Sequence, residues 1–398
     1  MLWTTFDFRP VNAWEKRKLG EIADIRGGGT PNTSKPEYWD GEIDWYAPAE
    51  IGTQRYVSGS RRQITNLGLN KSSATMLPAN KTILFTSRAG IGNAAILTKS
   101  GATNQGFQSI VVKPATDIYF LYSEVPEIKR KAIRLAAGST FLEISGKSLS
   151  KIQIWLPSFK EQSRIGHLFL QIDNLIAATQ QKISDLEDIK VSTLRNLFNQ
   201  TWRIRHYSDD WKNIKLSDIS TKVVEKNVNY QYKEVLTNSA EFGIVNQQDY
   251  FDKSIANPKS LSDYYVIHPN DFVYNPRISR LAPVGPVRRN KTGRIGVMSP
   301  LYYVFKIDGV DPTFLEYFFK NNGWHRFMYA NGDTGARADR FAIKDKVFEQ
   351  MPIQLPSKDE QEALGTSLKA LERLIAEFLK RLDNLKKLKE YLLSSVFA

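Results

Sequence analysis

The chain is built from two copies of one unit of about 200 residues. The segment Trp14–Ile22 returns as Trp211–Ile219, 197 residues later. A Leu-Pro pair and a Glu-Gln pair return 199 residues later: Leu156-Pro157 and Leu355-Pro356, Glu161-Gln162 and Glu360-Gln361. Half of the 398 residues is 199, so the duplication runs over the whole chain. Two similar units must therefore each bury a hydrophobic core.

Each unit predicts a globular domain followed by a long helix. Short β-branched and aromatic runs such as Thr82–Phe85 and Leu301–Phe305 indicate strands, and helical pieces around Val125–Leu135 and Pro312–Asn321 interrupt them. The predicted fold class is α+β (mixed α/β), as a tandem repeat. Its four parts are a first domain (1–157), a central helix (158–200), a second domain (201–356) and a C-terminal helix (357–398).

The two long helices show a seven-residue repeat. Their apolar residues alternate by four and three, which is typical of a coiled-coil seam. The seam residues are Ile165, Phe169, Ile172, Ile176, Ile183, Leu186, Leu364, Leu368, Leu371, Ile375, Phe378, Leu382 and Leu385. A polar interruption also matches, Lys190 against Lys389. If the copies follow a pseudo-two-fold axis, the helices pair antiparallel as a rod of about 55–60 Å, with one domain at each end.

A second apolar line runs beside the seam. It consists of Leu168, Leu175, Ile189, Leu374 and Leu388. One partner helix needs only two positions in each heptad, so a third predicts further burial. We interpret this line as a docking face for partner subunits; packing against the protein's own domains is the alternative.

The charge distribution indicates a polyanionic partner. The net charge is +13, and acidic residues are absent from residues 51–116 and 272–307. Carboxylates near a phosphate backbone would repel it, so these windows predict a surface that faces nucleic acid. The predicted contacts are Arg55, Arg61, Arg62, Lys71, Arg88, Arg277, Arg280, Arg288, Arg289, Lys291 and Arg294. Lys99 and Lys113 lie in or beside likely strands, and we expect them to be solvated surface residues without a DNA contact. For Asn104 and Gln105 we expect a structural role in a buried polar turn.

The sequence lacks the residues that several classes of function require. The chain has no cysteine, which excludes thiolate zinc sites and cysteine nucleophiles. No apolar run reaches the length of a membrane span, and the N-terminus lacks the apolar core of a signal peptide. The four histidines share no metal-ligand spacing. Asn275–Ile278 lacks the second proline and the aromatic residue of an amino-methyltransferase motif, so we predict no catalytic and no metal site.

A set of motifs in the first domain resembles a known family. In order, they are Gly28–Pro31, Tyr38-Trp39, Ser87–Gly92, Thr103–Gly106, Gly138–Ser145 and the Leu156-Pro157 exit. With the tandem repeat, they are similar over the whole chain to the specificity subunits of type I restriction–modification enzymes. The second domain departs from this pattern: it has Asn275–Arg277 and Gly335–Arg337 but no Gly-Gly-Thr-Pro.

The resemblance implies a non-catalytic, sequence-specific DNA-binding subunit for host defence in the prokaryotic cytoplasm. Two target-recognition domains would read an asymmetric bipartite site in double-stranded DNA. The partners would be two adenine-N6 methyltransferase subunits and the restriction/translocase subunits. S-adenosylmethionine, ATP and Mg would lie on these partners, with no cofactor in this chain and no membrane association. Two alternatives stay open: the separated recognition half of a fused restriction–methylation enzyme, and a coiled-coil scaffold.

Overall fold

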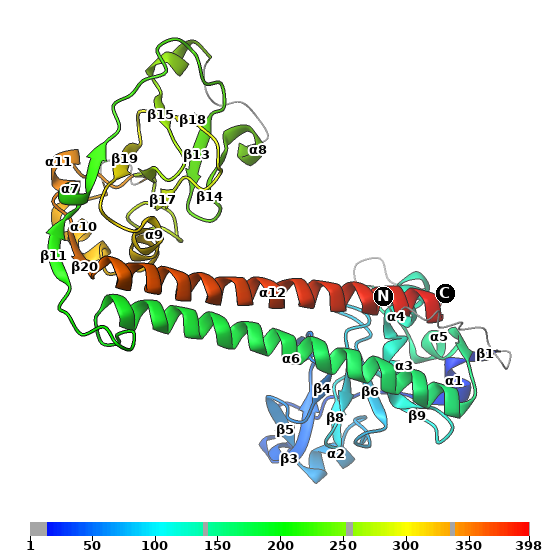
Figure 1. Ribbon diagram of the computed structural model, residues 1–398. Helices are drawn as coiled ribbons and strands as arrows, with labels where there is room; N and C mark the ends of the chain where they lie inside the picture. The colour runs from blue at the N-terminus through cyan, green and yellow to red at the C-terminus, as the bar shows by residue number, and fades with distance from the viewer. Residues whose placement is uncertain (1–13, 138–141, 252–257, 335–338, 398) are drawn as a thin grey trace. The chain divides into compact units, whose positions relative to one another are not determined.

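The computed structural model describes residues 14–137, 142–251, 258–334 and 339–397. The chain divides into two compact units: unit 1 is Met1–Gln181 with Lys380–Ala398, and unit 2 is Lys182–Leu379. Two 40-residue helices, α6 (Phe159–Phe198) and α12 (Lys358–Phe397), each contribute to both units (Figure 1). The sequence-based prediction places these helices at residues 158–200 and 357–398. Each compact unit therefore contains one domain together with part of both long helices.

The repeated motifs at the ends of each domain pair with each other. Strand β1 (Glu15–Lys18) lies antiparallel to β10 (Gln153–Leu156), and β11 (Lys212–Lys215) lies antiparallel to β20 (Pro352–Leu355). A proline then follows each closing strand, and it cannot donate to a continued ladder. The Leu-Pro pair thus ends the domain, and in both repeats the long helix starts two residues after the proline.

The central sheets of the two domains have the same strand order. In unit 1 the order is β2 (Ala23–Gly27), β9 (Gln108–Val112), β6 (Thr82–Phe85), β7 (Ala94–Leu97) and β4 (Tyr56–Val57). In unit 2 it is β12 (Ser220–Lys222), β19 (Tyr303–Ile307), β16 (Phe272–Tyr274) and β17 (Val287–Arg289). The first four strands correspond one to one, so the duplication seen in the sequence is also a duplication of the fold.

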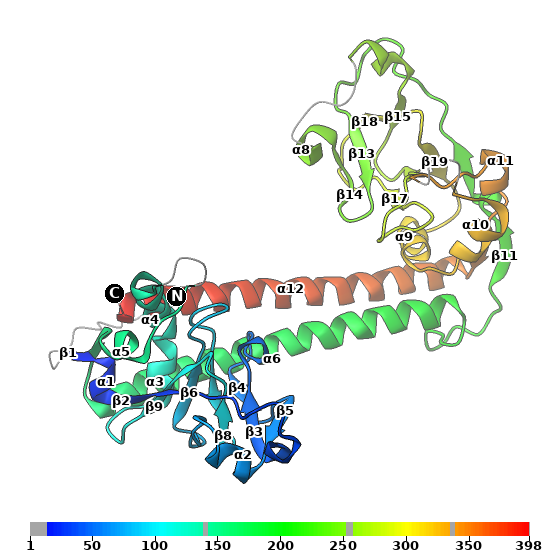
Figure 2. The same ribbon diagram turned by 180° about the vertical axis from the view of Figure 1, so that it is seen from behind.

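The domains differ in what surrounds this sheet. Unit 1 adds β5 (Arg62–Ile64), β3 (Trp39–Tyr46) and β8 (Gly101–Thr103), which lie beside α2 (Asn66–Asn70) in both views (Figure 1 and Figure 2). Unit 2 adds the pairs β13 (Leu236–Ser239) with β14 (Gly243–Asn246) and β15 (Tyr265–Ile267) with β18 (Gly296–Met298). The remaining short helices are α1 (Leu19–Ile22), η1 (Pro36–Tyr38), η2 (Pro48–Glu50), α5 (Gly146–Ser150), α7 (Leu216–Ile219), α8 (Gln247–Phe251), η3 (Pro258–Asp263), α10 (His325–Asn331) and α11 (Asp345–Phe348).

The repeated glutamine of each long helix fastens the helix to its domain. In unit 1 the Gln162 amide donates to the Pro157 carbonyl, and its oxygen accepts from the backbone of Asp117. The Asp117 carboxylate in turn caps α3 (Ile118–Ser123). In unit 2, Gln361 and Asp311 make the same contacts at α9 (Pro312–Lys320). These contacts give the glutamine of the Glu-Gln motif a structural role in both repeats.

The core of each unit contains residues from both long helices. Near the end of α12, Phe397 packs against the core of unit 1, with its ring centroid 5.4 Å from Phe120 and 5.9 Å from Phe169. Near the end of α6, Phe198 packs in unit 2 with its ring centroid 5.5 Å from Phe314. Phe198 and Phe397 are separated by the repeat length of 199 residues. Neither domain therefore completes its core with its own helix alone.

The predicted seam is buried to different degrees. Eight of its residues are at most 8% exposed: Ile165, Phe169, Ile172, Ile183, Leu186, Leu364, Leu368 and Ile375. Five are half-buried: Ile176, Leu371, Phe378, Leu382 and Leu385. Within unit 1 the helices run in opposite directions, because Phe169 meets Phe397 whereas Asp173 meets Lys389.

A buried carboxylate between α3 and α4 (Val125–Leu135) predicts a pH effect on unit 1. Burial raises the pKa of Glu124 to about 8, and its Oε2 has no hydrogen-bond partner among the described residues. The unfolded chain ionises this group near 4.5, so stability is lost as the pH rises from there towards 8. We expect Glu124→Gln to stabilise unit 1 at pH 8 by on the order of 3 kcal/mol and to have no effect at pH 4. Urea unfolding across this range measures the difference, and Glu37→Gln, at an exposed ion pair with Lys35, serves as the control without a gain.

Candidate nucleic-acid interface

The turn after β6 presents Arg88. Ala89, Gly90 and Gly92 all have positive φ, at 52°, 106° and 83°. Thr86 fixes the turn, since its carbonyl accepts from Gly92 N at 2.9 Å and its hydroxyl from Asn93 N at 3.0 Å. The side chain of Arg88 is half-buried and makes no hydrogen bond or ion pair with the residues that the structure describes. A hydrogen-bonded turn therefore holds a cation that has no counter-charge in the described part of the chain.

A second group of cations in unit 1 lies around β5 and α2. Arg61, Arg62 and Lys71 are exposed. The Arg62 guanidinium lies 3.6 Å from the centroid of the Trp39 ring, and Trp39 meets Trp45 edge to face. This cation–π contact orients Arg62 without neutralising it. The side chains of Arg61 and Lys71 have no polar partner within the described ranges.

Other polar residues of the first window are used inside the domain. Arg55 donates to the Tyr119 hydroxyl and to Asn174 Oδ1, each at 3.0 Å, and these contacts occupy its guanidinium. The structure therefore favours a structural role for Arg55 over the predicted DNA contact. Lys99 pairs with buried Asp44 at 3.0 Å, and Lys113 donates to two backbone carbonyls of α1.

The Gly-Gly-Thr-Pro loop and the Thr-Asn-Gln-Gly turn pack against each other. A Cβ on Gly28 would lie 2.0 Å from the Asn104 carbonyl oxygen. Thr30 donates to Gln105 Oε1, and the Asn104 side chain accepts from Gly106 N. These contacts agree with the structural roles expected for Asn104 and Gln105, and they place the glycines at a close approach inside the domain.

In unit 2 the loop after β16 corresponds to the loop after β6. Asn275 anchors it by donating to the Asn238 carbonyl and accepting from Arg277 N. Arg277 is 64% exposed, with only a 3.9 Å contact to Asp339, and Arg280 is exposed without a polar partner in the described part of the chain. Both line a cavity of about 410 Å³, together with Tyr250. Arg88 and Arg277 thus follow the equivalent strands β6 and β16.

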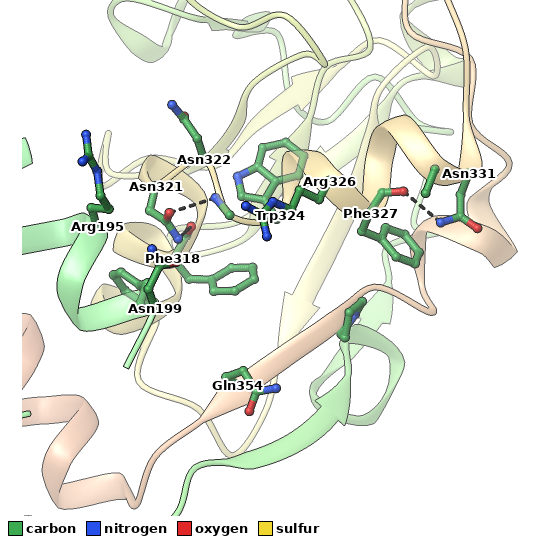
Figure 3. A pocket seen from close by; sticks show the side chains of 14 residues that line it. Arg195, Asn199, Phe318, Asn321, Asn322, Trp324, Arg326, Phe327, Asn331 and Gln354 are labelled. Atoms are coloured by element: carbon green, nitrogen blue, oxygen red, sulfur yellow. Dashed lines mark hydrogen bonds between the residues drawn. The ribbon is translucent and has the colours of Figure 1, made fainter. Parts of the chain in front are cut away.

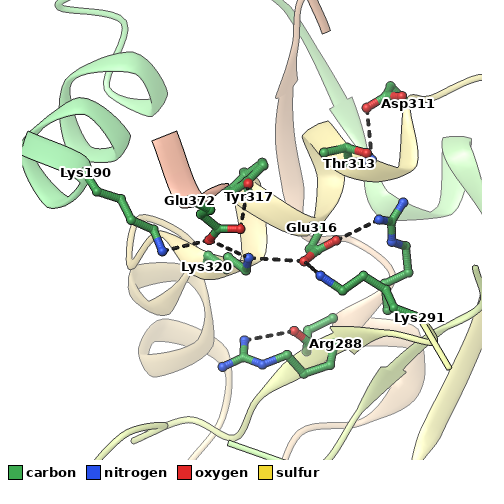
Figure 4. Close-up of polar contacts among 11 residues, drawn as sticks. Lys190, Arg288, Lys291, Asp311, Thr313, Glu316, Tyr317, Lys320 and Glu372 are labelled. Carbon is green, nitrogen blue, oxygen red and sulfur yellow. Dashed lines mark hydrogen bonds and ion pairs between the residues drawn. The ribbon is translucent and has the colours of Figure 1, made fainter. Parts of the chain in front are cut away.

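The rest of the second window is largely neutralised within unit 2 (Figure 4). Arg289 is 9% exposed and lies 2.9 Å from the carboxylate of Glu316, which Lys291 and Lys320 also contact. Arg288 is half-buried and donates to the Ala240 carbonyl at 2.7 Å, and burial lowers the pKa of its guanidinium. The prediction that Arg288 and Arg289 face DNA therefore needs correction, because their charged groups point into the domain.

Arg294 and Lys291 stay accessible. Arg294 is 60% exposed and pairs with Glu234 at 3.1 Å, and Lys291 is 56% exposed beside Glu316. Ion pairs near the surface are worth little, so a phosphate could replace Glu234 beside Arg294, whereas Glu316 is 7% exposed and stays with its buried partner. Burial opposes ionisation of Glu316, but Lys291, Lys320 and Arg289 outweigh it and hold the pKa of this carboxyl below its ordinary value.

The second apolar line of the long helices is largely open. Leu168, Leu175, Ile189 and Leu374 are between 37% and 49% exposed, and Leu388 is half-buried. Packing against the protein's own domains would have buried them, so the described contacts disfavour that alternative.

A cavity of about 630 Å³ that the sequence did not indicate lies in unit 2 (Figure 3). It is formed by the end of α6, by α9 and α10, and by β20. Phe318, Trp324 and Phe327 contribute rings, and the lining contains Arg195 and Arg326 but no carboxylate. Its residues are far apart in the sequence, so no local motif could have predicted it.

The described residues form neither a metal site nor a membrane-spanning helix. They hold no group of three or more histidine, cysteine or carboxylate side chains that could bind a metal ion. None of their helices is both long and apolar enough to cross a membrane. The motif segments Gly138–Phe141 and Gly335–Arg337 lie outside the described residues.

Comparison with known proteins gives a consistent result. Residues 12–188 match the model of the type I restriction modification DNA specificity domain. The MjaIX specificity subunit of Methanocaldococcus jannaschii is 34% identical over 189 residues, which cover 46% of this chain and 44% of that relative. The chain thus spans less than half of this relative. The MjaVIII specificity subunit of the same organism is 21% identical over 404 residues, covering 96% and 91%.

A solved structure has the same fold over the whole chain. The S subunit of a type I restriction-modification system from M. genitalium superposes with a TM-score of 0.57 at 14% identity, covering 100% of this chain and 98% of that one.

Proposed function

The chain belongs to the family of type I restriction–modification specificity subunits, and we propose that it recognises an asymmetric bipartite DNA target. Each unit reads one half-site, and the two long helices form an antiparallel coiled coil that keeps the half-sites at a fixed spacing. The chain performs no catalysis itself.

One observation carries this proposal. The loops after the equivalent strands β6 and β16 present Arg88 and Arg277, each with little or no counter-charge among the described residues. The neighbouring cations differ between the units, with Arg61, Arg62 and Lys71 in one and Arg280 and Arg294 in the other. A shared scaffold with different contact residues supports two half-sites of different sequence.

We further propose that the open apolar line on the long helices docks the methyltransferase subunits. Four of its five side chains are exposed, and exposed apolar side chains that recur along a helix favour a protein partner. The restriction/translocase subunits would join the same complex. S-adenosylmethionine, ATP and Mg would be held by those partners.

Co-expression of the chain with its cognate methyltransferase subunit tests the function. Genome-wide mapping of N6-methyladenine should give one asymmetric motif of two half-sites with a constant spacer. Absence of such a motif, together with salt-labile binding that ignores duplex sequence, would favour the scaffold alternative.

The exposed cations of unit 2 allow a sharper test. We expect Arg277→Ala with Arg280→Ala to make the slope of log affinity against log salt shallower by about 0.9 for each phosphate that the variant no longer neutralises. If one of them reads a guanine, its removal instead costs about 1–3 kcal/mol and relaxes one position of a half-site. Titration of cognate and shuffled duplexes across salt separates these results. Lys212→Ala, an exposed cation on β11, is the control, and a double variant that behaves like it would refute the interface.

A further inference from the structure

Both units contain a buried tyrosine, a carboxylate and a lysine in one hydrogen-bonded group. In unit 1 the Asp173 carboxylate on α6 accepts from the Tyr119 hydroxyl on α3 and from Lys389 on α12, both at 2.7 Å. In unit 2 the Glu372 carboxylate on α12 accepts from Tyr317 on α9 at 2.9 Å and from Lys190 on α6 at 2.7 Å (Figure 4). Each carboxylate thus joins three elements: the domain, one long helix and the other long helix.

The two groups correspond in the repeat. Asp173 and Glu372 are 199 residues apart, as are Lys190 and Lys389. The tyrosines differ in local position: Tyr119 is two residues after its capping aspartate and Tyr317 is six. The hydroxyls reach equivalent carboxylates from different turns of their helices, so the contact does not follow from the local course of the backbone alone.

Both groups extend to the basic windows. In unit 1, Arg55 donates to the Tyr119 hydroxyl. In unit 2, Lys320 contacts both Glu372 and Glu316, and Glu316 contacts Arg289 and Lys291. In each unit, continuous polar contacts therefore run from a window of predicted DNA contacts to the paired helices.

These contacts are costly to break. Asp173 and Tyr119 are 7% and 6% exposed, and Tyr317 is 1% exposed. A buried carboxylate is tolerated only when donors satisfy its oxygens, so it selects the one arrangement in which both donors reach it. Glu372 is only half-buried, with 29% of its side chain exposed, yet Lys190 and Lys320 outweigh the effect of its partial burial and hold its pKa at about 2.

We propose that Tyr119 with Asp173 and Lys389, and Tyr317 with Glu372 and Lys190, are positioning residues that fix each recognition domain on the helix pair. They hold the loops that carry Arg88 and Arg277 in one orientation. The consequence for target selection rests on the proposed function, whereas the positioning itself does not.

The conservative variants Tyr119→Phe and Tyr317→Phe test the proposal, since each removes one hydroxyl and leaves the ring and the ion pair in place. Tyr122→Phe is the matched control in unit 1, because the Tyr122 hydroxyl has no hydrogen bond among the described residues. The chain has no cysteine, so spin labels can be placed at chosen positions. Labels at the exposed pair Ser58→Cys and Ala178→Cys measure the distance between the domain of unit 1 and α6. Labels at the exposed pair Leu301→Cys and Ala370→Cys measure the distance between the domain of unit 2 and α12.

Pulsed electron resonance on the free full-length chain measures positioning without DNA. We expect one narrow distance distribution in the parent and in Tyr122→Phe, and a broadened one for unit 1 in Tyr119→Phe and for unit 2 in Tyr317→Phe. Unchanged distributions in both tyrosine variants would overturn the proposal, whatever their thermal stability. The distance measurement tests the positioning role even if the chain does not recognise a bipartite site.

Methylation mapping with the cognate methyltransferase measures the consequence. We expect Tyr119→Phe to reduce discrimination against targets with one base pair added to or removed from the spacer by about tenfold, with the other half-site unchanged. A merely structural role would lower the extent of methylation without altering the motif, and that result would overturn the link to target selection. If the parent itself yields no bipartite motif, the proposed function fails, and the distance measurement alone decides on positioning.

Discussion

Replacing Phe169 with alanine is expected to destabilise unit 1 by about 3–5 kcal/mol and to leave unit 2 folded. The Phe169 side chain is fully buried in the core of unit 1, where the ring of Phe397 stacks on it at 5.9 Å. Alanine leaves a cavity between α6, α12 and the domain that the surrounding side chains cannot close. Hydrogen exchange resolves the effect by unit: amides of β2, β6 and β9 should lose protection while those of β12, β16 and β19 keep it.

The adjacent residue provides the control for this experiment. Leu168 precedes Phe169 on α6 but is 37% exposed, so Leu168→Ala should change stability by less than about 0.5 kcal/mol. Under the proposed docking role, Leu168→Ala should instead weaken binding of the methyltransferase subunit. Loss of protection in both units of Phe169→Ala would show that the units unfold together, and full protection in unit 1 would contradict the core position of Phe169.

The sequence predicted the long helices well because a heptad repeat is a local pattern. The spacing that identified Ile165 and Phe169 depends only on neighbours three and four residues away. The end of each domain was also predictable, since a proline after a strand stops the ladder whatever the rest of the chain does. What no local pattern contained was that Phe198 and Phe397 pack into the domain of the opposite repeat.

The DNA contacts were harder to predict because counter-charges come from distant parts of the chain. Arg289 lies in a window without carboxylates, yet Glu316, 27 residues later, neutralises it. Arg55 likewise meets Tyr119 and Asn174, which lie outside its window. One signal was available: Glu316 is a lone carboxylate among the apolar residues of α9, and such a residue indicates a buried ion pair. The exposure of the side chains then distinguishes Arg277 and Arg280, which are exposed, from Arg288 and Arg289, which are not.

Removal of Glu316 should destabilise unit 2 by about 3–5 kcal/mol, because it leaves a buried charge without its partner. In Glu316→Ala the guanidinium of Arg289, 9% exposed, loses its carboxylate, and its Nε already lacks a hydrogen-bond partner among the described residues. The charges of Lys291 and Lys320 are compensated in other ways: Lys291 is 56% exposed to solvent, and Lys320 keeps its ion pair with Glu372. The cost therefore arises mainly at Arg289.

Two further measurements test the Glu316 prediction: the pH dependence of its effect on stability, and the same substitution in the pair that Glu234 forms with the exposed Arg294. The pKa of Glu316 is held below its ordinary 4.5, so its stabilising effect is present above that pH and is lost as the pH falls through the lower folded value. The stability difference between the parent and Glu316→Ala should thus shrink below pH 4.5. Glu234→Ala, which frees the exposed Arg294, should cost less than about 1 kcal/mol at any pH. If Glu316→Ala were as stable as the parent and bound DNA with a steeper salt dependence, Arg289 would face the duplex, and the assignment of its charge to the interior of unit 2 would be wrong.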